Sequence, residues 1–206
     1  MVGGFSDHLK RGLIDKMVKN LQRASSSANI IIVLNGEEDF ISNPEQEGSL
    51  DVRVEQFAEG CFCCGLKYEL SSVLSKLIAQ RVPDLIIMTV SVITDLELVS
   101  ELMREIGGDD LELVGIYSFD LKDANELIKA FPDMVNRNLI SSSTVMLVDE
   151  YGQMEDIETR TISTIREINP KLVNRSNLDV QGMNVTVVSK NYAMEEGNIL
   201  CKYILN

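Results

Sequence analysis

The chain has little positive charge and few residues that favour an anionic partner. Its 206 residues include 19 Lys and Arg against 32 Asp and Glu, which gives a formal net charge of −13 at pH 7. An acidic chain is not drawn by its overall charge to the phosphate backbone of nucleic acids or to anionic lipids. We therefore expect neither nucleic acid nor a membrane surface as a partner.

Long hydrophobic runs are also missing. No run reaches the length of about 18 apolar residues that is typical of a membrane-spanning helix. The segment from Met1 to Lys16 lacks the basic and then apolar order of a secretory signal peptide. The sequence thus predicts a soluble, cytoplasmic protein, and 206 residues are enough for one globular domain over positions 1–206.

Cysteine is scarce, yet three of the four cysteines fall within four positions. Cys61, Cys63 and Cys64 lie between Gly60 and Gly65. In a reducing compartment such residues stay as thiols or metal ligands, so we expect no structural disulfide. The cluster is the strongest indication of function in this sequence.

Short apolar runs rich in β-branched residues alternate with amphipathic stretches. The expected strands are 30–34, 85–90, 113–117, 144–148 and 185–188, and the expected helices are 8–23, 68–80, 96–106, 124–130 and 155–168. Because the runs show almost no polar alternation, we expect their strands to be buried on both faces. The pattern predicts an α/β fold with a doubly wound, mainly parallel sheet flanked by helices in three layers.

Ligands of such sheets bind where the strands end. The loops after Leu34, Val90 and Val148 are therefore the expected places for a site.

Three thiolates in this spacing suit a soft metal ion. Zn(II) or Cu(I) fits such a ligand set, and Co(II) or Ni(II) fits it with mixed ligands. The side chains converge only if the backbone turns sharply, and the two flanking glycines would allow that by adopting positive φ. A fourth ligand would be water or a carboxylate of Glu37, Glu38 or Asp39.

Two other interpretations of the cluster remain open. Free cysteines are often small buried hydrophobic residues, and a turn could hold them for packing alone. Thiol redox chemistry is the second, although Cys-Phe-Cys-Cys lacks the Cys-x-x-Cys spacing of thioredoxin-like sites. His8, the only histidine, is expected at the surface, and Cys201 is expected to pack in the core.

The run Gly60-Cys61-Phe62-Cys63-Cys64 resembles the Gly-Cys-x-Cys-Cys signature of the CobW-like branch of the CobW/HypB/UreG family of P-loop GTPases. Members of this family act in metal and cofactor trafficking. Further segments are similar to the family in order and spacing, namely 29–41, 52–70, 83–96 and 144–170. The resemblance covers nearly the whole chain and implies a P-loop NTPase-like fold, without the family's separate C-terminal domain.

The phosphate-binding loop of the family is altered here. Gly4 and Lys10 match its first glycine and its lysine. Its later glycines are replaced by Asp7 and Leu9, and its magnesium-binding hydroxyl by Arg11. A working P-loop needs those glycines so that backbone N–H groups can surround the phosphates.

Two other nucleotide motifs are altered as well. In the switch segment Ser91 and Asp95 match the family, whereas Thr89 stands in place of a glutamate. Where Asn-Lys-x-Asp would recognise guanine, the chain has the run from Val148 to Tyr151. Any remaining nucleotide contacts would come from Gly4, Lys10, Arg11, Ser91 and Asp95. Because phosphoryl transfer depends on positioning and charge stabilisation, these changes predict loss of GTP hydrolysis.

The sequence thus predicts a CobW-like protein that binds a divalent metal, Zn first and Co or Ni next, through Cys61, Cys63 and Cys64. Its expected role is storage, delivery or regulation beside a client metalloprotein or a corrinoid system. One alternative is a metal chaperone that still binds GTP with Mg²⁺ and hydrolyses it. A second alternative is a pseudo-GTPase that acts as an interaction subunit, in which case we would expect an oligomer.

Overall fold

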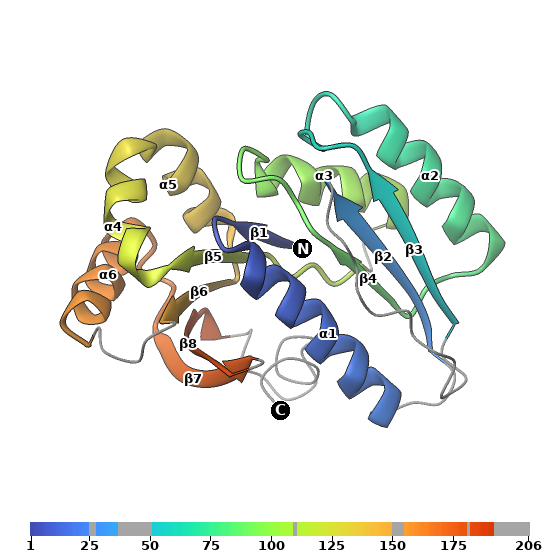
Figure 1. Ribbon diagram of the computed structural model, residues 1–206. Helices are drawn as coiled ribbons and strands as arrows, with labels where there is room; N and C mark the ends of the chain where they lie inside the picture. The colour runs from blue at the N-terminus through green and yellow to red at the C-terminus, as the bar shows by residue number, and fades with distance from the viewer. Residues whose placement is uncertain (25–27, 37–50, 109–110, 150–154, 181, 192–206) are drawn as a thin grey trace.

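Strands and helices alternate along the chain, as Figure 1 shows. The computed structural model describes residues 1–24, 28–36, 51–108, 111–149, 155–180 and 182–191. In chain order the elements are β1 (Val2–Gly4), α1 (Asp7–Ala24), β2 (Asn29–Asn35), β3 (Asp51–Phe57), α2 (Lys67–Gln80), β4 (Leu85–Met88), α3 (Leu96–Gly107), β5 (Ile116–Asp120), α4 (Leu121–Ala130), α5 (Pro132–Ser141), β6 (Thr144–Asp149), α6 (Glu155–Ile168), β7 (Asn174–Val180) and β8 (Met183–Ser189).

The strands form two sheets that meet at one bridge. The three-stranded sheet has the order β3-β2-β4 and the five-stranded sheet the order β1-β5-β6-β8-β7. A parallel bridge between Val2 and Thr89 joins β1 to the end of β4. Strands β1 to β6 pair in parallel, and β8 runs antiparallel to both β6 and β7. The carboxyl ends of the parallel strands therefore lie along one edge.

Helices cover both faces of the sheet, so the fold has three α/β/α layers. Successive residues of β2 show this, because Ile31 and Val33 belong to one buried cluster and Ile30 and Ile32 to the other. Helix α1 packs on the second cluster, while α2 to α6 pack on the first. The expected mainly parallel α/β sheet with strands buried on both faces is confirmed. Within the described ranges, no helix is both long and apolar enough to cross a bilayer.

Some expected boundaries were wrong. Strand β5 begins at Ile116 and extends to Asp120, three residues beyond the end of the expected run 113–117. The polar residue Ser118 interrupts the apolar run, so the sequence did not predict that the strand continues. In the core, the Ser118 hydroxyl donates a hydrogen bond to the Gly3 carbonyl at 2.9 Å. In α3, Val99 is buried as expected, whereas Leu98 is 46% exposed.

Besides β1 and β3, two further elements lie outside the expected strands and helices. Helix α5 follows α4 after the single residue Phe131 and starts with Pro132, which suits the first turn of a helix. Strand β7 alternates exposed and buried residues and pairs on one side with β8. A polar edge strand of this kind carries little hydrophobic signal in the sequence.

Candidate metal centre

The three clustered cysteines lie in the loop between β3 and α2, at the carboxyl edge of the sheet. This is the edge where the sequence predicted a site, although the loop follows β3 rather than one of the three loops expected. The end of β2 lies next to it, because β2 and β3 pair in parallel up to Asn35 and Phe57. The cysteine loop is thus attached to the rigid sheet.

Two side chains hold the loop in place. Phe62, between the cysteines, is fully buried, and its ring meets that of Phe57 edge to face at a centroid distance of 5.3 Å. The amide of Asn35 donates to the Gly60 carbonyl at 2.8 Å and accepts from the Gly60 N–H at 3.3 Å. The aromatic ring fixes the middle of the motif and the asparagine fixes its start.

The turn that gathers the cysteines is built on the carbonyl oxygen of Cys61. This oxygen accepts from the backbone N–H of Cys64 at 3.3 Å and from that of Leu66 at 3.1 Å. The expectation of positive φ at Gly60 and Gly65 was wrong, because neither is among the described glycines with positive φ. The helix-like turn does not need that conformation. Gly60 instead makes room, since a Cβ there would lie 3.1 Å from the side chain of Leu66.

The three Sγ atoms converge. All of them lie within 4.8 Å of one another, about 1 Å more than the separation of about 3.8 Å between two sulfurs on a tetrahedral zinc ion with Zn–S bonds of about 2.3 Å, so small side-chain rotations would bring them onto one ion. Exposure rises along the motif, from the buried Cys61 through the half-buried Cys63 to the exposed Cys64. The cluster therefore suits a soft metal ion, with one ligand reachable from solvent.

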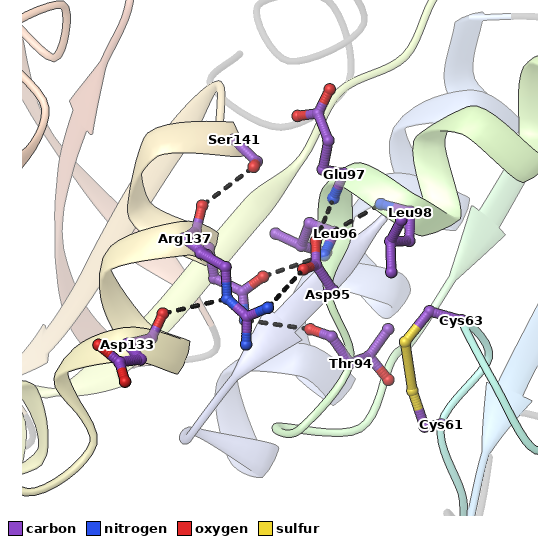
Figure 2. Close-up of polar contacts among 11 residues, drawn as sticks. Cys61, Cys63, Thr94, Asp95, Leu96, Glu97, Leu98, Asp133, Arg137 and Ser141 are labelled. Carbon is purple, nitrogen blue, oxygen red and sulfur yellow. Dashed lines mark hydrogen bonds and ion pairs between the residues drawn. A yellow bond between two sulfur atoms is a disulfide. The ribbon is translucent and has the colours of Figure 1, made fainter.

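A disulfide joins Cys61 to Cys63, and Cys64 is the free thiol (Figure 2). The expectation that the cysteines form no disulfide was wrong. Neighbouring cysteines rarely reach disulfide geometry, but the turn places the Cα atoms of this pair 5.5 Å apart, a usual separation for a disulfide. The cluster thus contains three sulfurs close enough to share a metal ion, and two of these sulfurs can also form a disulfide.

The carboxylates proposed as a fourth ligand, Glu37, Glu38 and Asp39, lie outside the described residues. Cys201, which the sequence predicted to pack in the core, lies outside them as well. His8 is exposed on α1, as expected. Among the described residues, the ligand group consists of the three cysteines alone.

At the start of α3 the expected nucleotide contact Asp95 has a structural role. Figure 2 shows this region. The Asp95 carboxylate caps α3 by accepting from the backbone N–H of Glu97 at 3.0 Å, and it pairs with Arg137 of α5 at 3.4 Å. Ser91, the other switch residue, is half-buried, and its carbonyl accepts from the backbone N–H of Thr94 at 2.9 Å.

Asn138 of α5 completes this arrangement, and sequence analysis missed it. Its buried amide accepts from the Leu96 N–H at 3.0 Å and donates to the Thr94 carbonyl at 3.0 Å. The hydroxyl of Thr94 itself is buried and has no hydrogen-bond partner among the described residues. No local signal marks Asn138, because its partners are more than 40 positions away in the sequence.

Thr89 connects the strands beneath the site. Its hydroxyl accepts from the backbone N–H of Asn35 at 3.0 Å, and its own backbone N–H donates to the Val33 carbonyl oxygen at 2.9 Å. Where the family resemblance expected a glutamate in the switch segment, this chain has a fully buried threonine that orders the end of β2.

The connection from β1 to α1 is a tight turn. Only Phe5 and Ser6 lie between these elements. Gly4 has φ of 106°, and a Cβ at this position would lie 2.2 Å from the carbonyl oxygen of Ser118. The Phe5 N–H donates to that same oxygen at 2.8 Å. So short a connection leaves few backbone N–H groups to surround a phosphate.

The side chains near this turn also differ from a phosphate site. Phe5 stacks on Phe119 at a centroid distance of 5.7 Å. Lys10 is buried in α1 with 5% exposure, whereas Arg11 is exposed. A cavity of about 460 Å³ beside the turn has three acidic lining residues, and its full lining is Phe5, Asp120, Asp123, Glu126, Leu127 and Ala130. Carboxylates in that cavity repel the phosphate oxygens of a nucleotide.

Comparisons with known proteins assign no family to the chain. No protein-family model matches it, and no curated protein does. Among solved structures, the chain is similar to M. jannaschii TYW2 in complex with AdoMet, at 12% identity over 90% of this chain and 76% of that chain. The TM-score is 0.32, and a likeness this low carries no conclusion about activity or ligand.

Proposed function

We propose that this protein binds one divalent metal ion through Cys61, Cys63 and Cys64 in their reduced form, Zn(II) first and Co(II) or Ni(II) as alternatives. The observation that carries the proposal is the convergence of the three Sγ atoms within 4.8 Å at the edge of the sheet. Thiolate ligands select soft or borderline ions such as zinc.

The graded exposure of the ligands supports a role in storing, delivering or regulating metal. Three protein ligands leave one position of a tetrahedral ion open, and Cys64 can be reached from solvent. A client metalloprotein, or a protein of a corrinoid system, would supply its own ligand at this open position. The resemblance of Gly60 to Cys64 to the CobW-like signature supports the same role.

GTP hydrolysis is not part of the proposed function. The short β1–α1 turn, the ring of Phe5 stacked on Phe119 and the structural use of Asp95 all favour loss of nucleotide chemistry. The P-loop motif in the sequence points in the same direction, because its later glycines and its magnesium-binding hydroxyl are replaced.

Metal titration of the reduced protein tests the proposal. We expect one Zn²⁺ or Co²⁺ per chain, with thiolate-to-cobalt charge-transfer absorption for Co²⁺. Replacing Cys63 or Cys64 with Ser removes one of three thiolates and should weaken binding about 100-fold or more. Cys201→Ser removes the one cysteine outside the motif, and it should bind like the parent chain if the motif alone supplies the thiolates.

Two results would contradict the proposal. In the first, the fully reduced chain binds no ion at micromolar concentration. In the second, Cys63→Ser and Cys64→Ser bind as tightly as Cys201→Ser, which would place the metal elsewhere.

A further inference from the structure

The same three sulfurs support two mutually exclusive states. The disulfide uses the Sγ atoms of Cys61 and Cys63, and it leaves Cys64 as the only thiol of the cluster. A disulfide sulfur carries no negative charge and is a poor metal ligand, whereas the thiolate is the form that binds metal. Formation of the disulfide therefore removes two of the three ligands.

We propose that Cys61 and Cys63 form a redox switch that controls the metal occupancy of the site. This inference rests on the proposed function, because it describes how the same cluster is regulated. In the reduced state the three thiolates hold the ion, and in the oxidised state the pair is a disulfide and the ion is released.

A structural role does not explain this disulfide. The bond links residues only two positions apart, and a cross-link stabilises a fold mainly by closing a long loop of the unfolded chain. The loop is already held by the buried ring of Phe62 and by the two hydrogen bonds of Asn35. The disulfide thus adds little to the stability of the fold. Its main consequence is that the two sulfurs are no longer available as metal ligands.

The oxidant that we assign to the switch is a peroxide, with hydrogen peroxide as the simplest case. The Cys61 and Cys63 thiolates lose one electron each and form the S–S bond. Peroxide takes these two electrons and two protons from solvent, and its O–O bond breaks to give two water molecules. The thiolate of Cys64 takes one further proton, so the divalent ion leaves with its charge unchanged. A thiol reductant reverses the step by thiol–disulfide exchange.

Peroxide titration of the reduced, zinc-loaded chain tests the switch. We expect one zinc per chain to be released to a colorimetric chelator as one equivalent of peroxide is consumed. Peptide mapping after alkylation should show Cys61 joined to Cys63 and Cys64 alkylated. Dithiothreitol, after removal of peroxide, should restore zinc binding. In metal-free Cys64→Ser the same disulfide should form, since the pair is intact.

The outcomes separate the switch from the proposed function. If the reduced chain binds no zinc, the proposed function fails and the switch fails with it. If zinc binds but peroxide does not release it, the switch is overturned and metal binding stands. The same holds if release occurs while Cys61 and Cys63 remain unjoined.

Discussion

Phe62 anchors the cysteine loop to the core and so fixes the positions of the cysteines on either side of it. It occupies the variable position of the motif, yet it is fully buried and packs edge to face on Phe57. Burying such a ring stabilises the fold by about 1.5–3 kcal/mol. With the ring directed into the core, the cysteines on either side of it are held at the rim.

Tyr117 provides a prediction about alkaline stability. Burial raises the pKa of its phenol to about 12, and the nearby side chain of Asn138 lowers it by a smaller amount. The unfolded chain ionises this group near pH 10. Between about pH 10 and 12 the unfolded state therefore binds fewer protons than the folded state, and the free energy of unfolding falls as pH rises.

Tyr117→Phe removes this ionisation. Urea unfolding at a series of pH values should show a steeper loss of stability in the parent chain than in Tyr117→Phe, with a difference of roughly 2–3 kcal/mol across the window. Parallel curves for the two chains would show that Tyr117 ionises alike in both states.

At the scale of elements, the site depends on β2, β3 and β4 ending side by side. Asn35 at the end of β2 is tied to the cysteine loop through Gly60 and to the end of β4 through Thr89. Both connections join neighbouring strands of the three-stranded sheet. Loss of the hydrogen bonds from Asn35 to Gly60 should therefore loosen the start of the cysteine loop, while Phe62 still holds its middle.

Asn35→Ala tests this coupling. Two hydrogen bonds to the cysteine loop are lost, so we expect zinc affinity of the reduced chain to fall about tenfold, the lower end of the effect of residues that orient metal ligands. Stability should fall by about 1–3 kcal/mol. Asn177→Ala, at an exposed position of β7, is the matched control and should change neither quantity. Unchanged zinc affinity in Asn35→Ala would contradict the coupling.

At the scale of the whole molecule, cysteines lie at one end of the carboxyl edge of the sheet and acidic residues lie toward the other end. The cysteines follow β3, while Asp120, Asp123 and Glu126 line the cavity near β5 and α4. The connection between β1 and α1 lies between them and contains only Phe5 and Ser6. This distribution favours a cation over a nucleotide.

Thermal unfolding measures this preference directly. A ligand that binds only the folded state stabilises it by RT ln(1 + [L]/Kd), and so raises the melting temperature once its concentration exceeds its Kd. We expect Zn²⁺ to raise the melting temperature of the reduced chain, and millimolar GTP with Mg²⁺ to leave it unchanged. Saturable micromolar binding of GTP in calorimetry would contradict loss of the nucleotide site and favour the GTP-binding alternative.

The sequence by itself determined the layers and the location of the chemistry. Buried β-branched runs such as Ile30 to Leu34 predicted strands covered on both faces, because the signal is local and strong. The motif from Gly60 to Gly65 identified the thiols for the same reason. The edge strand β7 escaped prediction because its polar residues resemble a loop.

The tertiary structure decided how the thiols are held and what surrounds them. The disulfide between Cys61 and Cys63, the hydrogen bonds of Asn35 to Gly60 and those of Asn138 to Thr94 and Leu96 all depend on where backbones meet in space. Residues 25 or more positions apart become neighbours only when parallel strands pair and helices pack on them. Local sequence patterns do not specify such contacts, because hydrogen-bond geometry is set by the packed chain.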